Sequence, residues 1–252
     1  MVRDGVRLHH EMHGAEGAIP LLLLQGMGGE IAGWRRILPG LAEAFRVVAL
    51  DFRGNGRSDK PDAPASMTEH AADALAVLDA LEIARTHVFG VSLGGMVAQV
   101  LALDHPERVL GMVLGCTSAG PRLAARGASR APKGPPYRAL YAPGFPEAHP
   151  DHVAEDLFAG APTRQPAAAR RRHREAMAGF DAWDRLGEIR APTLVIHGSR
   201  DQLLDPENAR RLAAAIPGSR LHLVEGAGHM LHSERPEEIV REVVGFLRGA
   251  AS

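Results

Sequence analysis

Short apolar runs recur along the chain and are separated by segments whose apolar positions repeat at helical spacing. Several of these runs contain no alternation of polar and apolar residues. Unbroken runs are typical of parallel strands that helices cover on both faces. The alternation of strands and helices predicts an α/β fold with a mostly parallel sheet and right-handed crossovers. The expected strands are 6–12, 21–24, 47–50, 87–89, 109–114, 193–197 and 221–224.

Three helix starts carry recognisable capping signals. The sequence Ser66-Met67-Thr68-Glu69 resembles a capping box and predicts a helix that runs to Leu81. Asp205 and Pro206 supply an N-cap and a first-turn proline for a helix through Ala215. Pro236 opens a last helix in which one face is apolar, at Ile239, Val243, Val244 and Leu247.

The sequence Gly90-Val91-Ser92-Leu93-Gly94 has the form Gly-x-Ser-x-Gly, between an apolar run and a helix-like segment over 96–103. A serine between two glycines at a strand-to-helix turn is the pattern of a nucleophile elbow. The turn strains the serine backbone, and larger flanking side chains would clash there. We therefore expect Ser92 to be a nucleophile, with the backbone N–H of Leu93 as an oxyanion donor at the start of the helix.

An acid and a base follow in the chain order that this motif requires. Asp201 lies in the loop after the run 193–197, and His229 lies in the loop after 221–224. Both residues are expected beyond the carboxyl ends of strands, where open α/β sheets place their active sites. We predict that His229 takes the Ser92 proton and that Asp201 orients the imidazole. The alternative is that Asp201 only caps a turn and His229 is a surface loop residue.

From Leu21 to Leu247 the chain resembles the α/β-hydrolase superfamily, which implies that fold: a mostly parallel central sheet flanked by helices, with an inserted helical cap. Residues 90–97 and 105–109 are most similar to the 3-oxoadipate enol-lactonase and small carboxylesterase branch. Residues 51–58 resemble its glycine-rich turn. The resemblance implies a second oxyanion donor, the backbone N–H of Met27. The family usually has His-Gly before that position, whereas this chain has Gln25-Gly26.

Residues 120–185 contain no strand signal, and the first part is rich in proline, glycine and arginine. The resemblance implies that 120–185 form a cap over the active site, with 1–119 and 186–252 as the core. We expect irregular backbone over 120–144 and helices around 152–159 and 167–179. The expected pocket residues are Gly26, Gly28, Trp34, Met96, Leu140, Phe145, Phe158 and Met230. For the apolar cap residues, the alternative is that they only anchor the cap to the core.

The expected cap is also basic. Arg122, Arg126, Arg130 and Lys133 precede the run 170–174, which is Arg-Arg-Arg-His-Arg. One or two of these cations could hold a substrate carboxylate. A solvated helix face is the alternative, because runs of charge usually face water.

Net charge, cysteine content and apolar runs limit the binding partners and the cellular compartment that we expect. The 252 residues carry a net charge of −1, which gives no field that would attract nucleic acid or an anionic membrane. The single cysteine, Cys116, excludes an intramolecular disulfide, fits a reducing compartment and is expected to be a small buried residue. No signal-like or membrane-spanning run is present in the printed sequence, so we expect a cytoplasmic protein. Abundant arginine and alanine with few lysines suggest a GC-rich bacterial gene.

No cofactor is expected. The remaining histidines lack metal-ligand spacing with supporting acids, and the glycine-rich turns do not match a dinucleotide fingerprint. The expected partner is a small-molecule ester or lactone, and the sequence gives no indication of oligomeric state.

Three functions fit these observations. The first is a serine hydrolase that cleaves a small ester or lactone through an acyl-enzyme on Ser92. The second uses the same triad for carbon–carbon hydrolysis, cofactor-free perhydrolysis or a lyase reaction, which the fold cannot distinguish. The third is a non-catalytic ligand-binding member of the fold. Serine at the elbow argues against haloalkane dehalogenase or epoxide hydrolase activity, because these need a carboxylate nucleophile.

Overall fold

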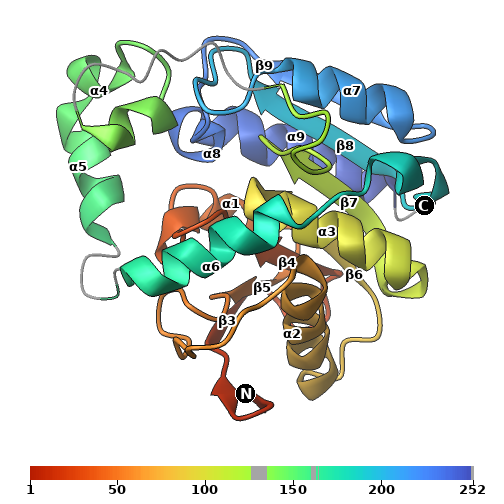
Figure 1. The fold of residues 1–252 in the computed structure, drawn as a ribbon. Helices are drawn as coiled ribbons and strands as arrows, with labels where there is room; N and C mark the ends of the chain where they lie inside the picture. The colour runs from red at the N-terminus through yellow and green to blue at the C-terminus, as the bar shows by residue number, and fades with distance from the viewer. Residues whose placement is uncertain (126–134, 160–162, 164, 251–252) are drawn as a thin grey trace.

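The computed structural model describes residues 1–125, 135–159, 163 and 165–250, without the side chains of 158 and 159. Its centre is a seven-stranded sheet in the order β3-β5-β4-β6-β7-β8-β9 (Figure 1). Strand β3 pairs antiparallel with β5, and every other neighbouring pair in this sheet is parallel. The strands are β3 (His10–His13), β4 (Pro20–Leu24), β5 (Arg46–Leu50), β6 (Thr86–Val91), β7 (Val109–Gly115), β8 (Thr193–Gly198) and β9 (Arg220–Val224).

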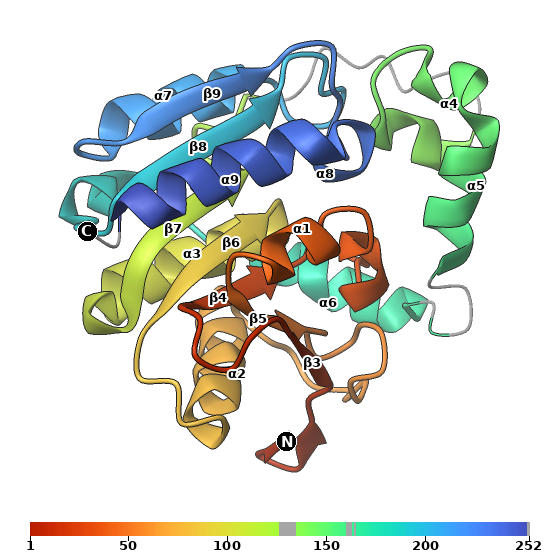
Figure 2. The same ribbon diagram turned by 180° about the vertical axis from the view of Figure 1, so that it is seen from behind.

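Two hydrophobic cores lie on the two faces of the sheet. In β4, Leu22 and Leu24 belong to one core, whereas Leu21 and Leu23 belong to the other. Because both faces are buried, the strand is apolar at every position rather than at alternate ones. Helices α2 (Met67–Ala80), α3 (Leu93–Asp104) and α7 (Glu207–Ala215) contribute to the first core (Figures 1 and 2). Helices α1 (Leu38–Ala42), α8 (Leu231–Glu234) and α9 (Pro236–Ala250) contribute to the second.

The expected strand over 6–12 is wrong. The structure contains a separate antiparallel pair, β1 (Val2–Arg3) and β2 (Val6–Arg7), and β3 begins only at His10. Asp4 and Gly5 join the pair with φ values of 52° and 76°. Consecutive positive φ values are what a tight hairpin turn requires, and an Asp-Gly dipeptide supplies them.

The capped helices are confirmed. Helix α2 (Met67–Ala80) follows Ser66, whose Oγ accepts a hydrogen bond from Glu69 N at 3.1 Å. Helix α7 (Glu207–Ala215) begins where Asp205 Oδ1 accepts from Glu207 N at 2.9 Å. Helix α9 (Pro236–Ala250) buries Ile239, Val243 and Leu247 along one side.

The chain between β7 and β8 contains only helices among its described residues. They are the 3₁₀ helix η3 (Pro136–Leu140), α4 (Phe145–Ala148), α5 (Pro150–Ala159), α6 (Ala167–Ala178) and the 3₁₀ helix η5 (Trp183–Glu188). The helices expected around 152–159 and 167–179 are present, and η3 adds order within a stretch expected to be irregular. In both views α4 and α5 lie together at one side of the molecule (Figures 1 and 2). We propose that 120–185 form a cap over the active site, and we call the described part of this range the cap segment.

Two short 3₁₀ helices complete the path: η1 (Ile31–Trp34) after β4 and η2 (Pro106–Arg108) after α3. Within the described ranges, no helix has both the length and the apolar character needed to cross a bilayer.

Candidate active site

Ser92 occupies the sharp turn between β6 and α3, with φ 55° and ψ −116°. This backbone conformation is costly for a non-glycine residue, and it persists only where the surroundings enforce it. Two glycines allow the close packing that does so. A Cβ on Gly90 would lie 2.2 Å from the Gly94 carbonyl oxygen, and a Cβ on Gly94 would lie 2.0 Å from the Leu24 carbonyl oxygen. The geometry is that of a nucleophile elbow.

Neighbouring chain holds the turn on both sides. Ser92 N donates to Gly115 O at 2.8 Å, and Thr117 Oγ1 donates to Ser92 O at 2.6 Å. The amide of Leu93, the first residue of α3, donates to no group in the described part of the chain. An unpaired N–H at a helix N-terminus can stabilise negative charge that develops beside Ser92.

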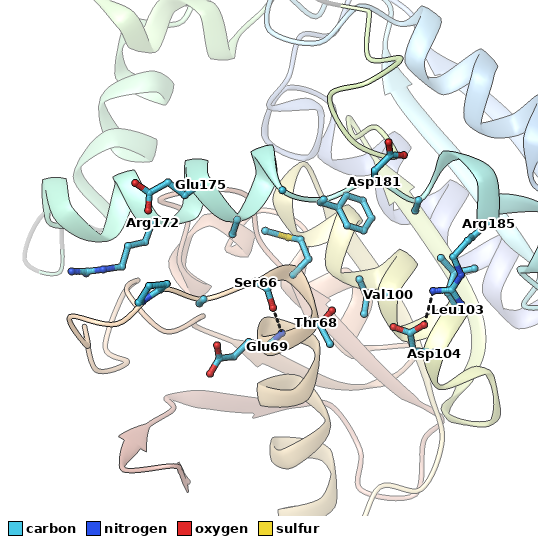
Figure 3. A pocket seen from close by; sticks show the side chains of 17 residues that line it. Ser66, Thr68, Glu69, Val100, Leu103, Asp104, Arg172, Glu175, Asp181 and Arg185 are labelled. Carbon is cyan, nitrogen blue, oxygen red and sulfur yellow. Dashed lines mark hydrogen bonds and ion pairs between the residues drawn. The ribbon is translucent and has the colours of Figure 1, made fainter.

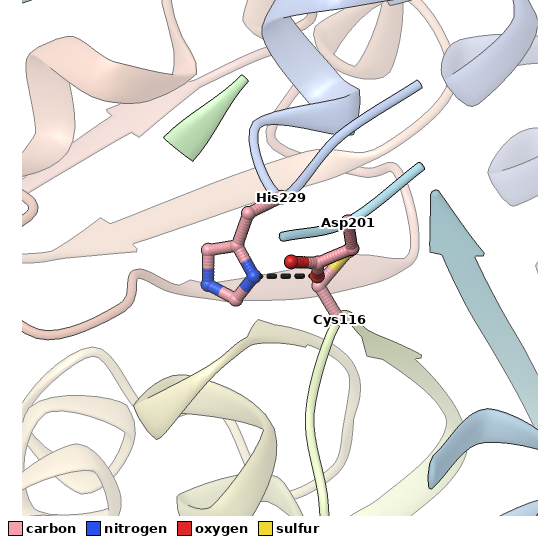
Figure 4. A group of neighbouring side chains, drawn as sticks. All are labelled: Cys116, Asp201 and His229. Atoms are coloured by element: carbon pink, nitrogen blue, oxygen red, sulfur yellow. Dashed lines mark hydrogen bonds and ion pairs between the residues drawn. The ribbon is translucent and has the colours of Figure 1, made fainter. Parts of the chain in front are cut away.

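Asp201 and His229 lie in contact beyond β8 and β9 (Figure 4). His229 Nδ1 lies 2.7 Å from Asp201 Oδ2, so Nδ1 carries the proton of the neutral ring and Nε2 is the free base. The other carboxylate oxygen, Oδ1, accepts from the backbone N–H groups of Leu203 and Leu204 at 2.8 and 3.1 Å. Asp201 is therefore fixed as an acceptor that orients His229.

A second histidine supports the same carboxylate. His197 Nε2 lies 3.1 Å from Asp201 Oδ2 and 3.0 Å from the Leu204 carbonyl oxygen. Since both neighbours are acceptors, Nε2 of His197 carries a proton. No local motif indicated this contact, because His197 lies inside the apolar strand β8.

The acid and the base shift each other's pKa. Burial opposes ionisation of Asp201, but the charge of His229 and hydrogen bonds from His197 and His229 outweigh burial and lower its pKa. For His229, burial lowers the pKa, and the attraction and hydrogen bond of Asp201 outweigh burial and raise it above the ordinary value. Asp201 thus stays ionised and stabilises an imidazolium on His229.

Of the three predicted triad residues, Asp201 and His229 are in contact. Ser92 lies at the turn between β6 and α3. No hydrogen bond joins Ser92 Oγ to His229 in the described structure. Catalytic hydrogen bonds are often loose in an unliganded site and tighten around the substrate.

Cys116 lies beneath this pair (Figure 4), with its sulfur within 4.8 Å of the nearest ligand atoms of Asp201 and His229. Its side chain is fully buried, as expected from the sequence. Burial raises the pKa of the thiol well above its usual value, so the sulfur stays protonated and is a poor metal ligand. Asp201 is already used by two backbone amides and two imidazoles. The cluster is therefore better suited to orienting His229 than to holding a metal.

The loop after β4 lies beside the nucleophile. A Cβ on Gly26 would lie 3.2 Å from Ser92 Cβ and 3.7 Å from Ser92 Oγ. The loop turns through a hydrogen bond from Gly29 N to Gly26 O at 3.0 Å, and the Met27 amide donates to no described group. The Met27 N–H therefore lies in the loop next to Ser92 and is an unpaired donor among the described residues. The Met27 side chain is exposed.

Gln25 stands where the family usually has histidine, and its side chain fills this loop from inside. Its Oε1 accepts from Gly26 N at 3.2 Å, and its Nε2 lies 3.4 Å from His232 Nε2. Cβ atoms on Gly29 and Gly33 would come within 2.9 and 2.8 Å of its amide group. The glutamine thus supplies hydrogen bonding that supports the loop in place of the histidine.

The other expected pocket residues lie in different environments. Trp34 has no exposed surface and packs against Phe89 and His232, and Met96 is 4% exposed in the core. The two side chains belong to different hydrophobic cores, and their contact with a substrate stays a prediction.

The cap residues of the expected pocket have local partners. Leu140 O accepts from Met230 N at 2.8 Å, which joins the cap segment to the loop of His229. Phe145 stacks on Tyr141 with ring centroids 5.6 Å apart, and it also contacts His149. The side chain of Phe158 lies outside the described residues.

A carboxyl group that sequence reasoning missed lies close to the base. Glu234 is 5% exposed and accepts from Gly228 N at 3.0 Å and from Ala142 N at 3.1 Å. Burial raises its pKa to about 7, and its charge contributes to the raised pKa of His229. Only the fold brings these groups together, so no local motif could have identified Glu234.

Three of the predicted cap arginines pair with acids or with backbone. Arg122 contacts Asp181 and Asp184, and Arg171 lies 3.5 Å from Glu175. The buried Arg172 donates to the Pro61 carbonyl oxygen and pairs with Asp62. These contacts favour a structural role for them over carboxylate binding. Arg126, Arg130 and Lys133 lie outside the described residues.

A groove of about 620 Å³ lies elsewhere, between the start of α2, the end of α3 and the end of α6 (Figure 3). It contains none of Ser92, Asp201 and His229. Its polar groups already pair with each other: Arg185 with Asp104 at 2.8 Å, and Ser66 with the Glu69 amide. The groove therefore does not compete with the catalytic candidates.

Comparison with known proteins agrees with this geometry. The chain is 35% identical to a putative carbamate hydrolase RutD of Variovorax paradoxus, over 95% of this chain and 96% of that protein. It is 33% identical to a 2-hydroxy-6-oxononadienedioate/2-hydroxy-6-oxononatrienedioate hydrolase of Cupriavidus pinatubonensis, over 98% and 93% of the two chains. Among solved structures, the enol-lactonase of Burkholderia xenovorans superposes with a TM-score of 0.85 at 28% identity, covering 97% and 98%.

The model of the alpha/beta hydrolase family matches residues 21–242, which include every strand from β4 to β9 and all three triad candidates. The elbow of Ser92 and the Asp201–His229 pair fall at the carboxyl ends of strands in that matched region. On the sequence match and the fold together, the chain belongs to the alpha/beta hydrolase family.

Proposed function

We propose that the protein is a serine hydrolase that cleaves a small ester or lactone through an acyl-enzyme on Ser92. The observation that carries this proposal is the 2.7 Å contact between His229 Nδ1 and the fixed carboxylate of Asp201, together with the strained elbow at Ser92. The contact leaves Nε2 of His229 unprotonated and available as a base.

In the proposed reaction, Ser92 Oγ attacks the substrate carbonyl carbon while His229 Nε2 takes the hydroxyl proton. The backbone N–H groups of Met27 and Leu93 stabilise the oxyanion. His229 then gives the proton to the leaving oxygen, and the acyl-enzyme forms. A water molecule attacks the acyl carbon, His229 accepts its proton and returns it to Ser92, and the acid product leaves.

The two named relatives support a second candidate that uses the same residues. One acts, by its name, on a carbamate, and the other is named for the hydrolysis of a dienedioate. Carbamate hydrolysis or carbon–carbon hydrolysis would need the same nucleophile, base and oxyanion donors. The pocket rather than the triad would decide between these substrates.

The test is hydrolysis of p-nitrophenyl esters of graded chain length, together with phenyl carbamate, by the wild type and by Ser92→Ala. We expect the wild type to hydrolyse the short esters and the variant to be slower by about 10⁴-fold or more in kcat. Circular dichroism would verify that the variant is folded. Equal activity of the two proteins contradicts the proposal, and turnover of the carbamate alone favours the second candidate.

A further inference from the structure

Gln165 lies in the cap segment just before α6, and its side chain contacts Asn55 and the loop after β4 at Gly28. Its side chain is 7% exposed. Its Nε2 donates to Asn55 Oδ1 at 2.7 Å and lies 3.0 Å from His173 Nδ1. Asn55 is distant from Gln165 in sequence, whereas His173 lies in the helix that follows it.

The surrounding hydrogen bonds fix which end of the Gln165 amide is which. Asn55 Nδ2 donates to Gly29 O at 2.8 Å, so its Oδ1 faces Gln165 as an acceptor. His173 Nε2 lies 2.9 Å from the Arg53 carbonyl oxygen and must donate to it, so Nδ1 of the neutral ring is an acceptor. Burial lowers the pKa of His173, which keeps the ring neutral. Both N–H groups of Gln165 are therefore used.

The carbonyl oxygen of Gln165 is buried and has no hydrogen-bond partner among the described residues. It faces Gly28: a Cβ built on that glycine would lie 3.2 Å from Gln165 Oε1. Gly28 has a φ of 76°, so a side chain is disfavoured there and no Cβ of this residue crowds Oε1. Gly28 is adjacent to Met27, whose amide is the proposed oxyanion donor.

A buried acceptor without a partner costs free energy unless a ligand or water completes it. Gln165 is held rigidly, its free atom is an acceptor only, and it faces the loop that lies against Ser92. These features suit recognition of a donor on a bound molecule. A site built in this way discriminates strongly, because an analogue without the donor leaves the acceptor unpaired.

We propose that Gln165 Oε1 accepts a hydrogen bond from an O–H or N–H group of the substrate and so selects esters, lactones or carbamates that carry such a donor near the scissile carbonyl. This inference rests on the proposed function, because it assigns the substrate class of the same site. Gln165 touches substrate through its carbonyl oxygen and takes no part in bond breaking.

The test compares p-nitrophenyl butyrate with the 2-hydroxy- and 3-hydroxybutyrate esters for the wild type and Gln165→Met. Methionine has a similar length and carries no amide. The ratio of kcat/KM for two esters in one preparation does not depend on the fraction of folded enzyme. We expect the wild type to prefer a hydroxy ester by about tenfold, and the preference to fall below about twofold in the variant. The absence of a preference in the wild type, or its survival in the variant, overturns the proposal.

His70→Leu is the matched control. His70 packs against His173 with ring centroids 5.0 Å apart, but both of its ring nitrogens lack hydrogen-bond partners and it does not contact the Gln165 amide. We expect it to keep the hydroxy-ester preference. An equal loss of preference in this control would show a general packing effect and reject the assignment to Gln165.

Ser92→Ala separates this inference from the proposed function. If that variant is inactive toward all three esters while Gln165→Met leaves the ratios unchanged, only the substrate assignment fails. If Ser92→Ala hydrolyses the esters as the wild type does, both proposals fail.

Discussion

Ser92 and Cys116 follow neighbouring parallel strands, and both have positive φ values, 55° and 41°. Such conformations cost about 1–3 kcal/mol each for non-glycine residues, so the surrounding contacts must outweigh them. Ser92 N bonds to Gly115 O, and Cys116 N bonds to Ile196 O at 3.0 Å. Each strained residue is thus tied to the next strand, which aligns the serine, the buried thiol and Asp201 along one edge of the sheet.

The substitution Glu234→Gln is expected to move the acidic limb of the kcat/KM–pH profile to lower pH. His229 must be neutral to act as a base, and activity is lost as the pH falls through its pKa. The Glu234 charge is among the causes that raise that pKa. Glutamine removes the charge and keeps one acceptor oxygen, which can accept from Gly228 N or from Ala142 N.

The measurement is kcat/KM for a p-nitrophenyl ester from pH 4.5 to 9, for the wild type, Glu234→Gln and the exposed control Glu237→Gln. The control should leave the profile in place. If the acidic limb of Glu234→Gln is unchanged or moves to higher pH, the Glu234 charge does not raise the pKa of His229.

Helix α5 is the element that connects the cap segment to both catalytic loops. Its Asp156, with a side chain 4% exposed, pairs with Arg35 and with Arg36, whose Nε lies 3.3 Å away. Asp156 also accepts from Tyr141 OH at 3.0 Å and from Ser233 Oγ. The arginines follow η1, beyond the oxyanion loop, and Ser233 lies in α8, after His229. The Asp156 carboxylate therefore joins α5 to the chain after η1 and to α8.

Removing that carboxylate should loosen the cap segment. We expect Asp156→Ala to lower the free energy of unfolding by about 2–3 kcal/mol, because it leaves two half-buried arginines and two hydroxyl groups without their shared acceptor. KM should rise as well, since the loops around the site lose their common anchor.

Urea unfolding and ester kinetics test this expectation. Glu155→Ala serves as the control because Glu155 is 62% exposed and pairs with Arg36 at 2.7 Å. A surface ion pair is worth less than about 1 kcal/mol. Similar stability losses in the two variants would argue against Asp156 as the anchor.

For the whole molecule, local patterns predicted the parallel sheet, the capped helices and the order of the triad candidates. Those features depend on strand burial, capping chemistry and turn glycines, which neighbouring residues specify. The split of 6–12 was missed because Asp4-Gly5 was not interpreted as a hairpin turn, although that dipeptide favours one. Gln165, Asp156 and Glu234 could not be predicted, because each has a partner that lies 92 to 121 residues away in sequence: Asn55, Arg35 and Ala142, respectively.

Buried neutral histidines should make the fold sensitive to acid. Burial lowers the pKa of His70 to about 3 and the pKa values of His87 and His232 to about 4. Below about pH 6.5 the unfolded chain binds protons at these sites and the folded chain does not, so stability falls as the pH falls. A single such histidine costs about 2 kcal/mol between pH 7 and pH 5.

Urea midpoints at pH 7 and pH 5 test this for the wild type and His70→Leu. The variant should lose less stability over that interval, by about the contribution of one histidine, whatever its stability at pH 7. An identical loss in both proteins would mean that His70 is protonated in the folded state or already shielded in the unfolded one.

The contact of Gly94 with the Leu24 carbonyl oxygen has a consequence for engineering the enzyme. The helix α3, which starts after Ser92, cannot move away from β4 without losing this close packing. Libraries that vary Gly90, Gly94 or Gly26 are therefore expected to yield mostly inactive clones. Leu140, Phe145 and Gln165 take no part in this packing, so variation of their side chains leaves it intact and offers more room for new substrate ranges.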